Sequence, residues 1–288
     1  MDILVLGGTR FFGIHLVRTL LDTGYHVTIA TRGRAKDEFS DRVRRIIVER
    51  SDIDSLKNVF KDKYYDVVFD NLAYCSNDVK IILDSVQCKR YIMASSAAVY
   101  NNQTGTTELE FNPMRKSLKW CSRGDFPYDE TKRQAECALF QKYASQHAVA
   151  VRYPFVIGED DYTKRLYFYV EHVVKGIPMF VDNIEEQLTF IQSDEAGKFL
   201  AYLAEHDFHG PINGSSYGTV SLNEIITYVE EKTGRKAIYS HVGEAGPYNG
   251  EKELSINTEL AASIGFEFSI LKDWIYALLD KYIKMVDC

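Results

Sequence analysis

The 288-residue chain is predicted to be an α/β protein, with a doubly wound parallel sheet and a smaller, mostly helical C-terminal part. Two observations lead to this prediction. Short apolar runs, typical of strands covered on both faces, alternate with helical patterns over the first 152 residues. A glycine-rich turn joins the first of these runs to the first helix. From Pro154 the alternation stops, which marks the second part.

The first strand is predicted at residues 3–6, and the glycine turn 7–13 follows it at once. Apolar residues then recur at helical spacing until Gly24. A strand that turns through glycines into a helix N-terminus presents unpaired backbone N–H groups and a partial positive charge. This unit therefore predicts a site for the pyrophosphate of a dinucleotide.

The rest of the first part continues the alternation of strand and helix. Its strands end in polar or small residues, at the edge where an open parallel sheet binds its ligand. Strands are expected at 25–30, 44–48, 66–70, 90–94 and 148–152, and helices at 54–60, 79–86 and 128–146.

In the second part, Ser221 and Glu224 form a predicted capping box that opens a helix, and Gly234 closes it. A helix at 193–204 is expected to return to the first part. The predicted dinucleotide-binding domain is therefore 1–152 plus about 187–208, and the substrate-binding part is 153–186 plus 209–288. The other elements expected here are a strand at 188–191 and helices at 166–175, 257–264 and 270–282.

Composition and charge narrow the classes of function. The net charge of −7 lacks the basic surplus of nucleic-acid binders, which disfavours nucleic acid as a partner. No apolar run is long enough to span a bilayer and the first strand begins at residue 3, so we expect a cytoplasmic protein without membrane contact. The five cysteines show no C-x-x-C spacing and the seven histidines are scattered, so no metal site is expected.

A candidate catalytic group consists of Ser96, Tyr128 and Lys132. Tyr128 and Lys132 stand at i and i+4, one above the other on a helix face, and Ser96 follows the fifth strand. Moving a proton near neutral pH with a phenol of pKa ~10 requires a stabilised phenolate, which a nearby ammonium provides. Ser96 would then hold the substrate oxygen by a hydrogen bond.

Three motifs in this order resemble the extended short-chain dehydrogenase/reductase family. They are Gly-Gly-x-x-Phe-x-Gly at 7–13, Ser-Ser-Ala-Ala-Val-Tyr at 95–100 and Tyr-x-x-x-Lys at 128–132. Within this family the chain is similar to the nucleotide-sugar epimerases, dehydratases and reductases, whose central sheet is of the Rossmann type. The residues at 152–154 and 189–194 extend the resemblance over essentially the whole chain.

The resemblance implies an NAD(P)-dependent oxidoreductase or epimerase that acts on a nucleotide-linked sugar by hydride transfer. Tyr128 would be the acid/base, Lys132 would bind the nicotinamide ribose, and Ser96 would orient the substrate oxygen. The implied cofactor-binding residues are Gly7, Gly8, Thr9, Arg10, Phe11, Phe12, Gly13, Thr31, Arg32, Asp52, Ile53, Asn71, Leu72, Ala73, Tyr128, Lys132, Tyr153 and Pro154. The implied substrate-binding residues are Tyr74, Phe155 and Arg165. The resemblance also implies a homodimer, in which 79–86 and 130–146 of each subunit form a four-helix bundle.

Two positions depart from the family pattern. Arg10 stands where a glycine is usual, and Thr31-Arg32 stands where NAD-preferring members end their second strand in an acid. Both changes favour a 2′-phosphate at this place, because an arginine can hold phosphate bidentately. The sequence therefore favours NADP over NAD. The alternative is that both arginines are solvated and that NAD binds.

The roles of two segments stay open. The Gly-Gly-Thr-Arg-Phe-x-Gly turn also resembles atypical, non-catalytic members of the superfamily that bind RNA or sense NADP, although these typically lack a complete Ser/Tyr/Lys set. The segment 114–125, which carries Arg123, is either an inserted active-site loop that meets a nucleotide diphosphate or an ordinary solvated loop. The residues do not separate an epimerase from a dehydratase or a reductase.

Overall fold

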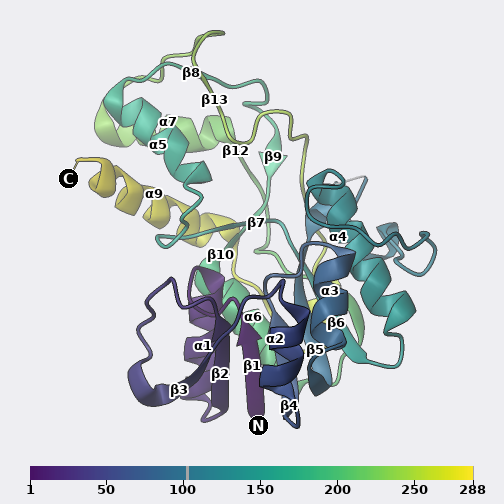
Figure 1. Ribbon diagram of the computed structural model, residues 1–288. Helices are drawn as coiled ribbons and strands as arrows, with labels where there is room; N and C mark the ends of the chain where they lie inside the picture. The colour runs from purple at the N-terminus through teal and green to yellow at the C-terminus, as the bar shows by residue number, and fades with distance from the viewer. Residues whose placement is uncertain (102–103, 288) are drawn as a thin grey trace.

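The computed structural model describes residues 1–101 and 104–287. Its central sheet has seven parallel strands in the order β11-β6-β5-β4-β1-β2-β3 (Figure 1). The strand order reverses beside β1, and ligands of such sheets bind outside the carboxyl ends of the strands at this point. The strands are β1 (Asp2–Leu6), β2 (His26–Thr31), β3 (Val43–Ile47), β4 (Tyr64–Asp70), β5 (Gln87–Ser96), β6 (His147–Tyr153) and β11 (Gly210–Asn213).

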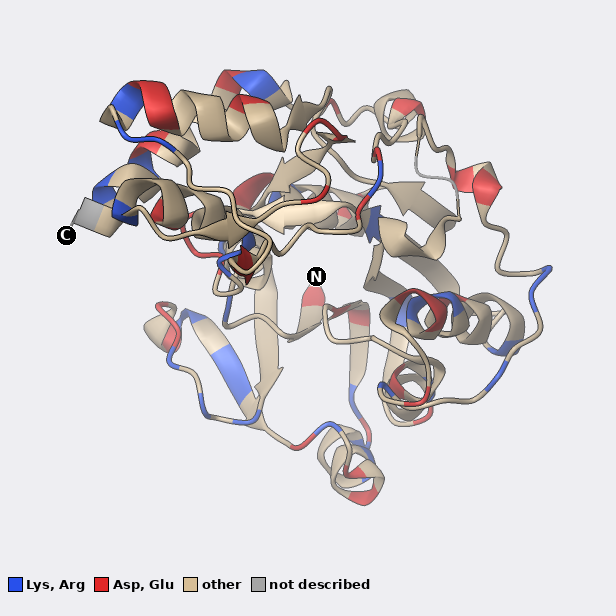
Figure 2. Cartoon of the chain, turned by 90° about the horizontal axis from the view of Figure 1, so that it is seen from above, with Lys and Arg blue, Asp and Glu red and all other residues tan. Residues whose placement is uncertain are grey.

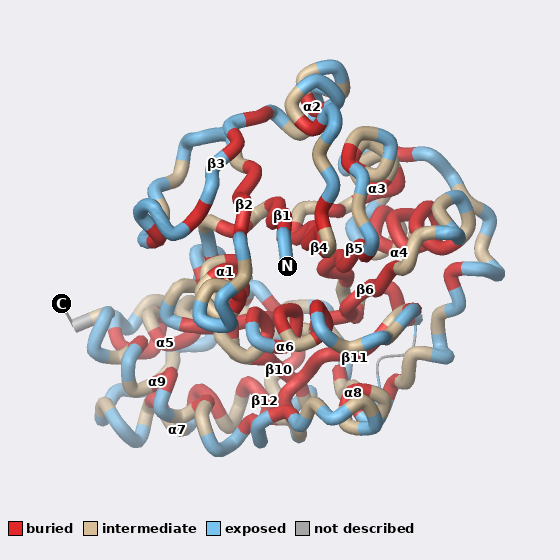
Figure 3. The backbone as a smooth tube through the Cα atoms, turned by 90° about the horizontal axis from the view of Figure 1, so that it is seen from below, coloured by how far each residue is buried: buried red, intermediate tan, exposed pale blue. Residues whose placement is uncertain are grey.

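Helices cover both faces of this sheet (Figures 1 and 3). Because side chains alternate along a strand, Ile3 and Val5 of β1 pack on one side with α1 and α6, whereas Leu4 and Leu6 pack on the other with α2 and α3. The helices are α1 (Phe12–Asp22), α2 (Ile53–Phe60), α3 (Ser76–Leu83), α4 (Tyr128–Cys137), its π-helical extension η4 (Ala138–Lys142) and α6 (Ser193–Glu205). The predicted doubly wound sheet is confirmed.

A further core holds the mostly helical C-terminal part together, built around α5 (Arg165–Lys175), α7 (Leu222–Thr233) and α9 (Leu271–Asp287). The predicted capping box opens α7, since Ser221 Oγ and the Glu224 side chain each accept the other residue's backbone N–H. The smaller elements are β7 (Phe155–Ile157), β8 (Met179–Phe180), β9 (Gln187–Leu188), β10 (Phe190–Gln192), β12 (Val220–Ser221), β13 (Glu244–Ala245), α8 (Glu259–Ser263), η1 (Ser40–Arg42), η2 (Ala97–Val99) and η3 (Glu108–Glu110). Among the described residues, no helix combines the length and apolar character needed to cross a membrane.

Two expected elements differ from the structure. The strand expected at 188–191 is divided into β9 and β10, because its two halves pair with different strands, β9 with β12 and β10 with β7. The sheet also extends past the expected domain boundary at residue 208, since β11 pairs with β6 at its edge. The strand β11 begins with Gly210 and Pro211, so it shows no alternation of apolar and polar residues from which a strand could be predicted. Proline has no backbone N–H to donate, and it is tolerated here because β11 lies at the edge of the sheet.

Candidate active site

A cleft of about 780 Å³ lies at the carboxyl ends of β1, β2 and β4. This volume is within the range of small-molecule sites. Its walls come from the glycine turn, from the turns after β2, β3 and β4, and from the segment before α4. The predicted ligand-binding residues that line it are Gly7, Thr9, Arg10, Phe11, Phe12, Thr31, Arg32, Asn71, Leu72 and Tyr74.

The glycine turn lets α1 begin directly against β1. A Cβ on Gly13 would lie 2.0 Å from the carbonyl oxygen of Gly7, so only glycine permits this approach. Gly7 itself has a φ of +84°. Arg10 is not among the residues with positive φ, and its exposed side chain lies in the cleft. The turn therefore accommodates arginine where the family pattern has glycine, and the neighbouring Phe11 takes the positive φ, at 54°.

Positive charge gathers in this cleft although the chain as a whole is acidic. Five arginines and two carboxylates line it, a formal excess of three positive charges. Along the helices in Figure 2, by contrast, basic and acidic segments alternate. The arginines are Arg10, Arg32, Arg34, Arg50 and Arg123, and the carboxylates are Glu49 and Asp78. This imbalance favours an anionic ligand.

Two of these arginines are held by carboxylates. Arg50 donates from both terminal nitrogens to Asp70, at 2.6 Å each. Arg123 donates from Nε to Asp78 at 3.0 Å and from Nη2 to the carbonyl of Leu72 at 2.9 Å. Burial alone would raise the pKa of Asp78, but the charges of Arg50 and Arg123 outweigh it and hold that pKa below its ordinary value.

The other three arginines, Arg10, Arg32 and Arg34, form no side-chain hydrogen bond or ion pair within 1–101 and 104–287. Because their guanidinium groups have no partner from the chain, they are available to a phosphate in the cleft. The orphaned Oδ1 of Asn71 is a second unsatisfied group at the cleft wall. The phosphates of a dinucleotide would pair with the three arginines, and a hydrogen-bond donor of the same ligand would satisfy the Asn71 oxygen. The lining of the cleft therefore fits the dinucleotide cofactor that the resemblance implies.

Replacing Asp78 by Asn is expected to lower the free energy of unfolding at pH 7 by about 1–3 kcal/mol, because Arg50 and Arg123 lose a charged partner. The folded pKa of Asp78 is lowered, so its stabilisation is present above the unfolded value of about 3.9 and is lost as pH falls through the folded pKa. Urea denaturation should therefore show a difference in the free energy of unfolding between wild type and variant that is smaller at pH 3 than at pH 7. Asp22→Asn is the control, since Asp22 is an exposed carboxylate 3.8 Å from Arg42, and a gap that stays constant with pH would contradict the assignment.

The start of α4 brings Tyr128 and Lys132 together. Lys132 is only 3% exposed, and its Nζ donates to the carbonyls of Ala73 and Ala94, each at 2.9 Å. These two bonds attach α4 to the ends of β4 and β5. The same Nζ lies 6.0 Å from the ring centre of Tyr128, whose residue is 51% exposed.

Ser96 is the last residue of β5, two positions after the Ala94 carbonyl that Lys132 contacts. Its Oγ accepts a hydrogen bond from the backbone N–H of Ala98 at 3.2 Å, which leaves the hydroxyl hydrogen free to be donated. Arg133 of α4 donates to the Val99 carbonyl in the same turn at 2.7 Å. The turn that carries Ser96 is therefore attached to the helix that carries the other two candidates.

Tyr74 lies next to Lys132 at the wall of the cleft. Tyr74 lines the cleft, whereas Ser96, Tyr128 and Lys132 do not. The Lys132 Nζ lies 4.6 Å from the Tyr74 ring centre, and the Arg123 Cζ lies 4.2 Å from it. Burial, together with the neighbouring phenols, raises the pKa of Tyr74. Tyr74 therefore contacts both the cleft and the Lys132 ammonium.

Several other predicted cofactor residues lie outside the cleft wall. Asp52 caps α2, where its Oδ1 accepts the N–H of Ser55 at 2.9 Å, and Ile53 begins that helix. Tyr153 is buried and donates to the carbonyl of Ala196 at 2.7 Å. The residues Gly8, Gly13, Ala73 and Pro154 also do not line the cleft. Their roles toward a cofactor remain predictions.

The predicted substrate residues Phe155 and Arg165 meet in the C-terminal part. The Arg165 Cζ lies 5.3 Å from the Phe155 ring centre and 6.0 Å from that of Tyr248. These two rings are themselves 4.6 Å apart. A guanidinium over an aromatic pair is suited to a planar or anionic group, although neither predicted residue lines the cleft.

Several residues of the cleft wall were not predicted from the sequence. Arg50 is recognisable only by its ion pair with Asp70, twenty positions away. Tyr162 approaches the cleft from the C-terminal part and packs edge-on against Phe11, with ring centres 5.9 Å apart. Arg123, which the sequence placed in a candidate loop, does line the cleft, together with Ser122. No motif or periodicity signals the first two residues.

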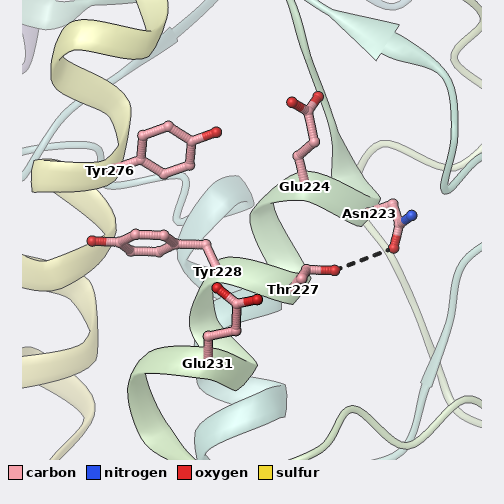
Figure 4. A pocket seen from close by; sticks show the side chains of 6 residues that line it. All are labelled: Asn223, Glu224, Thr227, Tyr228, Glu231 and Tyr276. Atoms are coloured by element: carbon pink, nitrogen blue, oxygen red, sulfur yellow. Dashed lines mark hydrogen bonds between the residues drawn. The ribbon is translucent and has the colours of Figure 1, made fainter.

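A second hollow, of about 270 Å³, lies between α7 and α9 (Figure 4). Its side chains are phenols, carboxylates and short polar groups, and Thr227 bonds Asn223 across 3.5 Å. It has no arginine or glycine turn to hold a phosphate. No group of three or more metal-ligating side chains occurs in the described part of the chain.

Comparison with known proteins agrees with this geometry. Residues 3–81 match the model of the NAD dependent epimerase/dehydratase family. Over 99% of this chain and 100% of the other, the fold matches a UDP-glucose 4-epimerase of Thermotoga maritima, with a TM-score of 0.78 and 18% identity. The predicted resemblance is thereby confirmed in sequence for residues 3–81, and the whole chain shares the fold of this epimerase.

Two curated relatives match in sequence. The chloroplast stem-loop binding protein of 41 kDa b from Arabidopsis thaliana is 35% identical over 112 residues, which are 34% of this chain and 30% of that protein. The 2′-dehydrokanamycin reductase of Streptomyces kanamyceticus is 22% identical over 213 residues, which are 72% of this chain and 59% of that protein. The matched regions thus span about a third and under two thirds of these relatives.

Proposed function

We propose that this chain is an NAD(P)-dependent oxidoreductase or epimerase that acts on a nucleotide-linked sugar, with NADP preferred. The observation that carries the proposal is the anchored pair on α4, in which the Lys132 Nζ is held by two carbonyls and lies 6.0 Å from the Tyr128 ring. This pair stands beside a cleft with an excess of arginine. The family match to NAD dependent enzymes supports the same conclusion.

The proposed roles follow from which donors and acceptors are free. Lys132 donates two of its three N–H groups to the carbonyls of Ala73 and Ala94, so one remains for a ribose hydroxyl. Ser96 keeps its hydroxyl hydrogen for the substrate oxygen, since its Oγ accepts from the backbone. Tyr128, exposed at the start of α4, takes or gives the proton of that oxygen, and the ammonium of Lys132 stabilises its phenolate form. A bound nicotinamide supplies the hydride acceptor or donor.

A test of the function uses defined probes. Thermal shift with NADP, alone and together with UDP-glucose or another sugar nucleotide, should show a larger rise in melting temperature for the pair than for either ligand alone. Absorbance at 340 nm should then report hydride transfer with that sugar nucleotide. A chain that neither binds a dinucleotide nor changes the absorbance would refute the proposal. The outcome also separates a dehydrogenase, which releases reduced cofactor, or a reductase, which consumes it, from an epimerase, which returns the hydride and leaves the absorbance unchanged after turnover.

The NADP preference predicts a selective effect at Arg32. Replacing Arg32 by Ser is expected to weaken NADP binding by about 10- to 100-fold and to change NAD binding little, because only the 2′-phosphate loses a charge-assisted partner. Calorimetric titration with both dinucleotides measures this difference. Arg42→Ser is the matched control, since Arg42 is an exposed arginine outside the cleft lining. Equal losses for NADP and NAD, or tighter wild-type binding of NAD, would contradict the assignment.

A second candidate function is RNA binding without catalysis. It rests on the 35% identity with a protein whose name describes stem-loop binding. The retained Ser96, Tyr128 and Lys132 and the acidic net charge oppose it. A gel shift with a stem-loop RNA that persists in moderate salt, together with absent hydride transfer, would favour this second function over the first. A cytoplasmic location stays a prediction.

A further inference from the structure

The helix α4 is buried on nearly all sides within a single chain. From Thr131 to Phe140 every residue except Arg133 is buried, and Figure 3 shows this helix largely in the colour of buried residues. A helix on the face of a sheet normally leaves its outer side to solvent or to a partner. Here another segment of the same chain must cover that side.

The covering segment is 112–125, which we call the strap. It is anchored to α4 and η4 by the side-chain amides of two glutamines. Gln134 accepts from the N–H of Lys119 at 2.6 Å and donates to the carbonyl of Ser117 at 3.3 Å. Gln141 donates to the carbonyls of Pro113 and Lys116, at 2.5 and 2.6 Å. Leu118 packs on the core beneath.

The strap is also anchored to α3. Ser76 Oγ donates to the carbonyl of Lys119 at 2.8 Å and accepts from the N–H of Cys121 at 2.8 Å. The N–H of Asn77 donates to the Cys121 carbonyl at 3.2 Å. Cys121 is 1% exposed. Backbone groups of the strap are thus paired with α3 and α4 rather than with water, which is how a permanently packed segment differs from a solvated loop.

We propose that the strap occupies the place of a second subunit on α3 and α4, so that this chain does not assemble through a four-helix bundle of these helices. In such a bundle the outer faces of the helices pack directly on one another, with axes 8–10 Å apart. The strap is hydrogen-bonded along the outer side of α4 and η4 and to the first residues of α3, so a partner helix could not pack directly on α4. The homodimer implied by the family resemblance, through 79–86 and 130–146, is therefore blocked. This inference is independent of the proposed enzymatic function.

The strap also contributes to the cleft. Its residues Ser122 and Arg123 line the cleft, and Arg123 is positioned by Asp78 and by the Leu72 carbonyl. The segment that covers the outer face of α3 and α4 therefore continues into the ligand-binding wall.

Sedimentation equilibrium of the full chain, with amide hydrogen exchange at low and high protein concentration, tests the proposal. We expect the mass of a single chain and concentration-independent exchange in α3, α4 and the strap. A dimer whose formation protects only amides outside α3, α4 and the strap from exchange also supports the proposal. A dimer whose formation protects α3, α4 or the strap overturns it.

A pair of matched variants tests the anchoring itself. Gln134→Ala removes the acceptor of the Lys119 N–H, so exchange at that amide is expected to be at least several-fold faster than in wild type. Gln146→Ala is the control, because Gln146 bonds the carbonyls of Cys88 and Lys89 and not the strap. If Gln134→Ala leaves the exchange of the strap unchanged, the strap is not held on α4 and the proposal fails.

Discussion

Replacing Tyr128 by Phe is expected to lower the rate of hydride transfer by about 10²- to 10⁴-fold, the usual contribution of a general acid–base group. The substitution removes the ionisable hydroxyl and retains the ring that lies 6.0 Å from the Lys132 ammonium. Since Tyr128 does not line the cleft, NADP affinity should stay within about twofold of wild type. Absorbance at 340 nm measures the rate where reduced cofactor is released or consumed, conversion of the sugar nucleotide measures it for an epimerase, and calorimetric titration measures the affinity.

The matched control is Tyr162→Phe. Tyr162 is another exposed tyrosine, it lines the cleft, and it packs on Phe11 without a proposed part in proton transfer. Its variant should retain most of the rate. A Tyr128 variant as active as the Tyr162 variant would remove Tyr128 from the mechanism, while the fold and the dinucleotide site would stand.

The second large effect concerns stability. Replacing Arg152 by Met is expected to lower the free energy of unfolding by about 3–5 kcal/mol, because Glu136 is left charged and buried without its partner. Both side chains have no exposed surface. Arg152 bonds both oxygens of Glu136, at 3.0 and 2.5 Å, and also the hydroxyl of Tyr100 at 3.1 Å. The pair ties β6 to the helix that presents Tyr128 and Lys132.

Urea denaturation at pH 7 measures the loss. Lys198→Met is the control, since the Lys198–Asp194 pair is exposed and should contribute less than about 1 kcal/mol. The double variant Arg152→Met/Glu136→Leu should recover part of the loss, because it removes the unpaired charge as well as the ion pair. A single variant no less stable than the Lys198 control would show that the buried pair does not hold α4 in place.

Much of the first part was predictable from local patterns. The glycine turn after β1 could be assigned because its residues are consecutive and their backbone requirements are local. Tyr128 and Lys132 could be paired because a helix brings positions i and i+4 together whatever it packs against. The edge strand β11 could not be assigned, since its Gly-Pro start carries no apolar alternation and only its pairing with β6 makes it a strand.

The sequence by itself determined the sheet, the glycine turn and the spacing of the catalytic candidates, because these depend on neighbours within a few residues. Only the tertiary structure decided that Tyr74 of the cleft wall packs beside the Lys132 ammonium, and that Arg50 is bound by Asp70. It also decided that segment 112–125 closes the outer face of α4. The physical reason is that burial and ion pairing depend on which distant segments fold side by side, and no local periodicity encodes that choice.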